Sequence, residues 1–240
     1  MERSVSRPIL QRTATLMAVS IVSLCLLAAI TGFLLAFYYE PTAGGAHDSL
    51  KMISSQIPAG NLILGVHNRA GNLVILLALI QLVVMFLGRQ FKGSWLTGWF
   101  SGIFLALAVI GLSWTAIPLD WDQTGFWRFK VELSIIESIP LVGGTIRQVL
   151  TGGGGINSTT LQHMYSLHSY VAAIAALLLA VVHLTSLILQ ENTWASQRLR
   201  QAWAALRQPR PQSAKSAERM TSVNGGTVTP LAVKQQEADL

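Results

Sequence analysis

The stretch "VHNRAGNLVILLALIQLV", residues 66–83, is a long apolar run with one histidine near its start, His67, and a glutamine, Gln81, fourteen positions later. A second apolar run, "SLHSYVAAIAALLLAVVHLTS" at residues 166–186, has a histidine near each end, His168 and His183. Runs of this length and composition are typical of helices that cross a membrane. A polar or ionisable side chain is costly there, so these four positions are functional candidates.

Composition places the whole chain in the membrane-protein class. Hydrophobic residues make up 51% of the 240 residues and charged residues only 12%, about half the usual charged fraction of a soluble domain. The first apolar run is too long for a signal peptide, and "FYYEPT" follows it in place of a cleavage site. We therefore expect an all-α membrane protein with four spans, at about residues 13–38, 61–88, 99–118 and 169–189.

Basic residues near the span ends predict the orientation. They gather before the first span, between the second and third, and after the fourth, as Arg3, Arg7, Arg12, Arg89, Lys92, Arg198 and Arg200. By the positive-inside rule both termini are cytoplasmic. The net charge of +6 is thus explained by topology. Because these residues form no patch interleaved with aromatic side chains, we expect no nucleic-acid partner.

The chain has one predicted membrane domain with polar ends. We expect a cytoplasmic segment at 1–12, a four-helix transmembrane domain at 13–195, and a basic, disordered cytoplasmic tail at 196–240. Apolar residues at helical spacing predict short surface helices within the loop at 119–160. The single cysteine, Cys25, rules out an internal disulfide, and no CxxCH motif for covalent haem attachment occurs.

The spacing of the four polar positions predicts two facing pairs. At about 100° per residue, His168 and His183 lie within about 60° of one helix face, and His67 and Gln81 within about 40°. Since the second and fourth spans run in the same direction, His67 pairs with His168 and Gln81 with His183. Two facing imidazoles can bind a haem iron from both sides. Small residues could make room for the porphyrin or for close helix packing: Gly32, Gly71, Gly102, Gly111 and Ala116.

Further stretches, in order and spacing, resemble the N-terminal four-helix part of cytochrome b, in the split form called cytochrome b6. The similarity runs from about Ile21 to Glu191. The stretches that carry it are "TGFLLAFYYEPT" (31–42), "GNLILGVH" (60–67), "WDQTGFW" (121–127), "IPLVGGTIRQVLTGG" (139–153) and "STTLQHMYSLHSY" (158–170).

This resemblance implies a haem-binding four-helix bundle in a plasma or thylakoid membrane. In the family, two histidine pairs on the second and fourth helices bind two b-type haems, one near each membrane face. Matched by position, His67 and His168 are the outer pair. His183 is one member of the inner pair, and its partner position holds Gln81.

Other departures from the family also fall near the inner haem. At the positions where the family has basic residues around that haem and the inner quinone site, this chain has Val84, Trp95 and Ile188. The family's cysteine that tethers an extra haem corresponds to a position near Leu16. Leu64 stands where the family has an arginine beside the outer haem, and Arg69 is close enough in sequence to pair with a propionate of that haem instead.

Gln81 leaves more than one state open for the inner site. An amide oxygen is a weak ligand for haem iron, so His/Gln ligation is disfavoured. The remaining states are a cavity filled by side chains, with Gln81 and His183 hydrogen-bonded to each other, or a five-coordinate haem on His183. We favour a single haem, at the outer site.

The expected function is that of an electron-transfer subunit of a quinol oxidoreductase, with no catalytic residue of its own. Electrons would pass between a quinol/quinone pool and a Rieske-type or c-type protein, near an outer surface that includes Asp122, Ile139 and Pro140. Partner subunits would supply the remaining cytochrome b helices, and a homodimer is the family's usual state. The alternative is a degenerate structural or assembly subunit of a larger electron-transfer complex.

Overall fold

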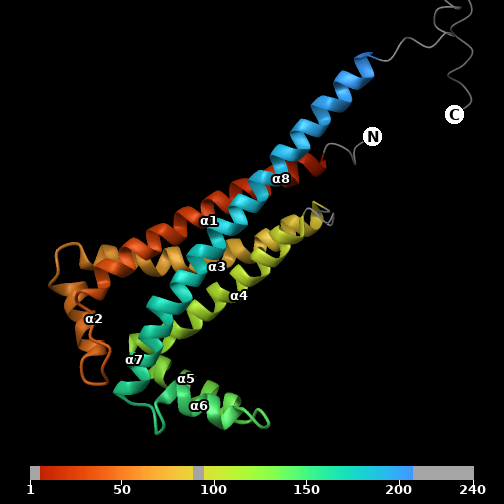
Figure 1. Cartoon of the computed structure of the whole chain (residues 1–240). Helices are drawn as coiled ribbons and strands as arrows, with labels where there is room; N and C mark the ends of the chain where they lie inside the picture. Colours follow the sequence, from red (N-terminus) through yellow and green to blue (C-terminus); the bar gives the residue numbers. More distant parts are fainter. Residues whose placement is uncertain (1–5, 89–94, 208–240) are drawn as a thin grey trace, which may run out of the picture. The chain divides into compact units, whose positions relative to one another are not determined.

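The computed structural model describes residues 6–88 and 95–207, and within them all regular structure is helical (Figure 1). The elements are α1 (Ser6–Ala36), α2 (Ala46–Ser55), α3 (Gly60–Leu87), α4 (Leu96–Ala116), the 3-10 turn η3 (Ile117–Asp120), α5 (Gln123–Glu137), α6 (Gly143–Thr151), α7 (Ser158–Ser166), the π-helical segment η4 (Leu167–Ala172) and α8 (Ala173–Arg207).

The chain divides into two units, residues 1–193 and 194–240. All contacts discussed below lie in the first. The predicted tail at 196–240 begins inside helix α8, which continues to Arg207, and its remainder lies outside the described residues. The same is true of the first five residues and of the basic positions Arg89 and Lys92.

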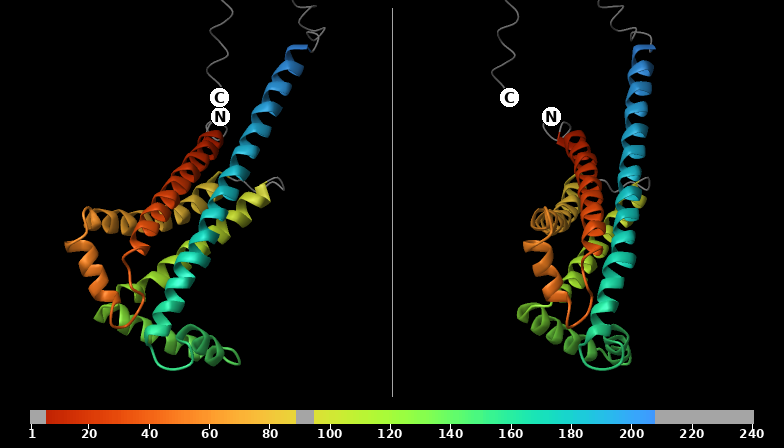
Figure 2. Two further views of the ribbon diagram at one scale, coloured as in Figure 1. Left: turned by 60° about the vertical axis from the view of Figure 1, so that its left-hand side comes forward. Right: turned by 90° about the vertical axis from the view of Figure 1, so that its left-hand side faces the viewer.

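Within residues 6–88 and 95–207, four helices are long and apolar enough to cross a membrane, which confirms the predicted fold class. They are Ile9–Ala36, Gly60–Leu87, Leu96–Asp120 and Ser158–Thr193. The fourth is longer than the predicted span because α7, η4 and α8 follow one another without a break. Successive spans run in opposite directions, so the starts of α3 and of η4 lie at the same end of the bundle (Figure 2).

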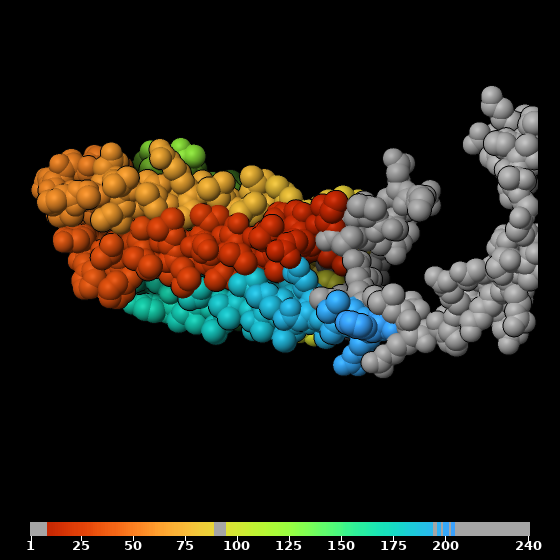
Figure 3. Space-filling model, turned by 90° about the horizontal axis from the view of Figure 1, so that it is seen from above, coloured from red at the N-terminus to blue at the C-terminus, as the bar shows by residue number. Residues whose placement is uncertain are grey.

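The core of the bundle is built from small and branched side chains. Buried residues of all four spans meet there: Ile21, Val74, Ala78, Leu105, Ala106, Val109, Ala176 and Ala180. Small side chains allow the close backbone approach on which helix association in lipid depends. On the face seen in Figure 3, α1 lies between α3 and α8.

Short helices cover the end of the bundle where α3 begins. Helix α2, in the loop after the first span, was not predicted from the sequence. Helices α5 and α6 lie in the loop where apolar spacing predicts surface helices, and Asp122 caps α5 by accepting from the Gly125 amide at 2.6 Å. Burial raises the pKa of Tyr39, whose hydroxyl donates to the Leu119 carbonyl at 2.8 Å and ties the end of α1 to η3.

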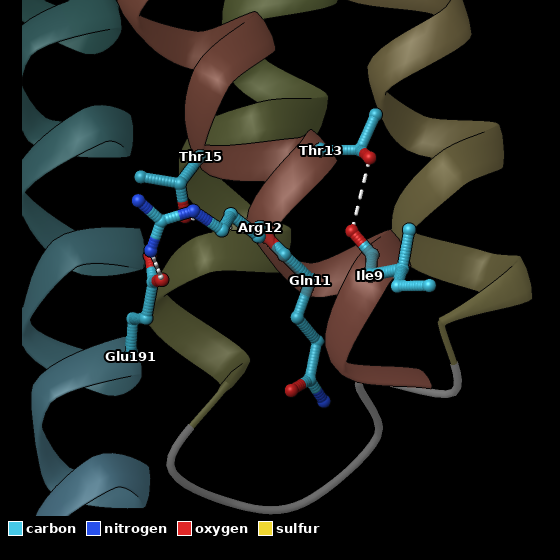
Figure 4. A network of polar contacts seen from close by, with 6 residues as sticks. All are labelled: Ile9, Gln11, Arg12, Thr13, Thr15 and Glu191. Atoms are coloured by element: carbon cyan, nitrogen blue, oxygen red, sulfur yellow. Dashed lines mark hydrogen bonds and ion pairs between the residues drawn. The ribbon is translucent and has the colours of Figure 1, made fainter. Parts of the chain in front are cut away.

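At the opposite end an ion pair joins the first and last spans. Arg12 of α1 reaches Glu191 of α8 at 3.2 Å (Figure 4). The Arg12 side chain is 74% exposed, and exposed pairs contribute at most about 1 kcal/mol. The position of α1 is therefore determined mainly by the packing and the buried hydrogen bonds described next.

Candidate functional site

His67 is the eighth residue of α3, and its ring is held by α1. Its Nδ1 lies 3.0 Å from the Ala28 carbonyl and 3.2 Å from the Thr31 hydroxyl. A carbonyl oxygen can only accept a hydrogen bond, so Nδ1 carries the proton. Nε2 then has the free lone pair that a metal-binding histidine requires.

His168 lies in η4 and is held in the same way by α4. Its Nδ1 lies 3.0 Å from the Leu112 carbonyl and 3.2 Å from the Thr115 hydroxyl. The rings of His67 and His168 face each other with centroids 6.3 Å apart and an angle of 62° between their planes. The structure thus brings together the two side chains that the sequence places in one pair.

Gln81 and His183 also meet, but in direct contact. The Gln81 amide nitrogen donates to His183 Nε2 at 3.2 Å and to the Ala14 carbonyl at 2.9 Å. His183 Nδ1 lies 3.1 Å from the Gly98 carbonyl and 3.0 Å from the Ser101 hydroxyl. Both side chains are almost fully buried, and the Gln81 carbonyl oxygen has no hydrogen-bond partner among the described residues.

The predicted small residues differ in what surrounds them. A Cβ added at Gly32 would lie 2.9 Å from His67 Cε1, and one at Gly102 would lie 2.9 Å from His183 Cε1, so both glycines admit a histidine ring. At Gly71 and Gly111 an added Cβ would meet nothing within 4 Å.

Arg69 is exposed on α3, and its contact with a haem propionate stays a prediction.

Comparison with known proteins decides the family. The family model described as Cytochrome b/b6/petB matches residues 6–192, more than three quarters of the chain. The chain belongs to the cytochrome b/b6 family. Members of this family bind b-type haems.

The similar proteins include cytochrome b6 from several algae. Cytochrome b6 of Gracilaria tenuistipitata var. liui is 31% identical over 158 residues, which cover 66% of this chain and 74% of that protein. Cytochrome b6 of Emiliania huxleyi is 33% identical over 153 residues, or 64% and 71% of the two chains.

A chain of a solved structure titled "Hyperthermophilic respiratory Complex III" matches with a TM-score of 0.60 and 22% identity. The match covers 75% of this chain, which spans about half (47%) of the solved chain. At this identity the likeness supports the fold alone.

In this cytochrome b/b6 chain the histidine contacts repeat along two helices. The Nδ1 atom of each of these histidines lies within hydrogen-bond distance of a backbone carbonyl and of a side-chain hydroxyl on α1 or α4. The carbonyl belongs to a residue i, the hydroxyl to residue i+3, and residue i+4 is a glycine or an alanine. We call these three positions an acceptor motif. The motifs with a hydroxyl are Ala28–Thr31–Gly32, Gly98–Ser101–Gly102 and Leu112–Thr115–Ala116.

The fourth motif begins at Ala14, whose carbonyl accepts from Gln81. Its starting position is fourteen residues before Ala28, and the two motifs of α4 start fourteen residues apart as well. Fourteen residues are two heptads, the period at which neighbouring helices of a bundle stay in register. His67 and Gln81 of α3 have this spacing too, so the three helices α1, α3 and α4 share one period.

The histidines of the last span have a different spacing, and a π turn corrects it. His168 and His183 are fifteen residues apart, which in a regular helix would turn them about 100° away from a fourteen-residue pair. The π segment η4, Leu167–Ala172, starts at this point. A π turn absorbs one extra residue. Both histidines therefore reach acceptor motifs that are only fourteen residues apart.

Deleting Val171 is therefore expected to preserve the site. Val171 is exposed to the outside of the bundle, and its loss leaves fourteen residues between His168 and His183, which a regular α-helix brings into register. The haem content of the purified protein should stay within about 20% of that of the unmodified chain.

The matched control is insertion of one alanine after Val171. Two surplus residues exceed what one π turn absorbs, so this variant should lose most of its haem. Equal haem contents in the deletion and the insertion variants would contradict this account of η4.

The hydroxyl groups and the π turn were missed from the sequence. The hydroxyls had a usable signal, because Thr31, Ser101 and Thr115 each lie three residues after a motif start and directly before a glycine or alanine. The π turn had one also, in the unequal spacings of fourteen and fifteen residues.

Proposed function

We propose that this chain is the membrane subunit of a quinol-oxidising or quinone-reducing complex, with a single b-type haem held between His67 and His168. In this proposal the haem exchanges electrons with the quinone pool and with a partner redox protein of the Rieske or c type. Further subunits supply the remaining cytochrome b helices, and the chain works as part of that complex, which we expect to be dimeric.

The distance between the two imidazole rings carries the proposal. Metal–imidazole bonds are about 2 Å long, so two imidazoles on opposite sides of one metal ion have centroids about 6 Å apart. The 6.3 Å between the rings of His67 and His168 matches this value. Both rings keep Nε2 for the metal because Nδ1 is bound to a helix carbonyl.

The other pair does not fit a haem. Two nitrogens on one iron would be about 4 Å apart with the porphyrin between them. The facing nitrogens of Gln81 and His183 are 3.2 Å apart, and the His183 lone pair already accepts the Gln81 amide hydrogen. Leu82 also fills the space beside Gly102, where its Cδ2 lies 3.3 Å from an added Cβ. We therefore favour the filled cavity over a five-coordinate haem on His183.

A haem in the first site supplies one-electron oxidation and reduction, and the chain's residues orient its ligands. With the second site closed, electrons enter and leave on the same side of the membrane. This is the side of η3, α5 and α6, and we propose that it is the outer side, with both termini cytoplasmic. Ile139 and Pro140 are exposed there, and Asp122 caps α5, so they remain candidates for lining a quinol or partner surface.

Haem quantitation tests the proposal directly. The pyridine haemochrome of the purified full chain is expected to give one b-type haem per chain, with a b-type signal in the reduced-minus-oxidised spectrum. A chain without haem would refute the proposal, and two haems per chain would refute its single-haem part.

A second measurement separates electron transfer from a purely structural role. The haem should be reduced by quinol in native membranes that contain the complex. A haem that no quinol reduces, in a complex that still oxidises quinol, would favour the structural or assembly subunit that the sequence left open.

A further inference from the structure

In the part of α1 and α4 whose side chains the structure describes, three hydroxyl groups are buried, and each of them contacts a histidine. Within residues 9–36 and 96–116 the hydroxyl side chains that are less than 9% exposed are those of Thr31, Ser101 and Thr115. Their oxygens lie 3.2, 3.0 and 3.2 Å from Nδ1 of His67, His183 and His168. Other hydroxyls of α1, such as those of Ser20 and Ser23, are exposed and bind only carbonyls of their own helix.

The direction of these hydrogen bonds follows from their neighbours. The Thr31 hydroxyl donates to the Leu27 carbonyl at 2.7 Å, and the Thr115 hydroxyl donates to the carbonyl of Leu112 at 2.9 Å. Each hydroxyl has then used its only hydrogen, and its lone pairs face the ring nitrogen. The N–H of each histidine is consequently shared between a carbonyl and a hydroxyl, which both draw on the same proton.

The fourth acceptor motif lacks the hydroxyl and also lacks a histidine. Three residues after Ala14 the chain has Met17, which cannot accept such a bond strongly, and the side chain bound to the Ala14 carbonyl is Gln81. The hydroxyl is thus present at the three motifs that hold an imidazole and missing at the one that does not. Every helix backbone provides carbonyl groups, so the carbonyl is present at all four motifs and only the hydroxyl distinguishes them.

From this pattern we propose that Thr31 and Thr115 are positioning residues that lower the reduction potential of the haem between His67 and His168. The proposal rests on the proposed function, because it needs a haem at that pair. A second acceptor on Nδ1–H makes the imidazole a stronger electron donor, which stabilises the oxidised iron. It also restrains rotation of each ring, since two acceptors one helical turn apart define its plane.

The test is a redox titration of the full chain with Thr31→Val and Thr115→Val, singly and together. Valine has nearly the volume of threonine without the hydroxyl. The haem spectrum should persist, and the midpoint potential should rise. At a fixed solution potential we expect the ratio of oxidised to reduced haem to fall about threefold per substitution, which equals about 28 mV at 59 mV per tenfold.

Two controls keep this test specific. Thr31→Ser and Thr115→Ser keep the hydroxyl and should leave the potential unchanged. Thr185→Val removes an exposed hydroxyl of α8 that binds only the Val181 carbonyl, at 2.8 Å, and should also leave it unchanged. Loss of haem from a valine variant but not from its serine counterpart would likewise support the proposal, because the hydroxyl would then be needed to hold the ring.

The results that would overturn it are equally distinct. Unchanged potentials in both valine variants with full haem content would refute the role of the hydroxyls while leaving the proposed function intact. Loss of haem from the valine and serine variants alike would also refute it, because side-chain volume would then be the cause. Absence of haem from the unmodified chain would instead refute the proposed function.

Discussion

Replacing His168 with alanine is expected to remove the b-type haem signal from the purified chain, with a fall of about tenfold or more in haem per chain. His168 is one of the two histidines of this pair, whose ring centroids lie 6.3 Å apart. Without His168, only His67 would remain to hold the iron. The His67 ring is half-buried. His67→Ala should have the same effect, and both are measured by the pyridine haemochrome.

The matched control for this prediction is His183→Ala. His183 is as deeply placed as any polar residue of the bundle, and its loss leaves the Gln81 amide with one acceptor in place of two. An unsatisfied buried polar group costs about 1–3 kcal/mol, so thermal stability should fall. The haem signal should nevertheless persist. If His183→Ala and not His168→Ala removed the haem, the assignment of the site would be reversed.

Much of this fold could be predicted from the sequence because its signals are long and periodic. Four apolar runs imply four spans whatever the detailed packing. Positions fourteen or fifteen residues apart lie at opposite ends of a span, so the pairing of His67 with His168 and of Gln81 with His183 follows from topology. Neither inference depends on knowing which side chains touch.

What could not be predicted depends on contacts between helices that are distant in sequence. The spacing of His168 and His183 shows that one residue is surplus, yet several positions between them could have absorbed it. Likewise, an amide opposite a histidine is compatible with an open or a closed cavity. Only the 3.2 Å contact and the packing of Leu82 against Gly102 distinguish the two.

The acceptor motif beginning at Ala14 differs from the three motifs that hold an imidazole. It has Met17 and Ala18 where the motif beginning at Ala28 has Thr31 and Gly32. A Cβ at Gly32 would lie 2.9 Å from the His67 ring, closer than real Cβ contacts allow without a shift. Ala18, fourteen residues earlier and almost fully buried, has that Cβ, so an imidazole at position 81 would meet an alanine, as His168 does at Ala116, and not the open position that His67 has at Gly32.

Gln81→His alone is therefore expected to leave the haem content at one per chain. The new ring would lack a hydroxyl acceptor and would face His183 across a gap too narrow for a porphyrin. The variant Met17→Thr/Ala18→Gly/Gln81→His restores the motif, and in it we expect a second b-type haem by pyridine haemochrome. A second haem in Gln81→His alone would mean that the cavity is open and that the glutamine is the only obstacle. One haem in the triple variant would mean that the packing around Leu82, and not the motif, keeps the site closed.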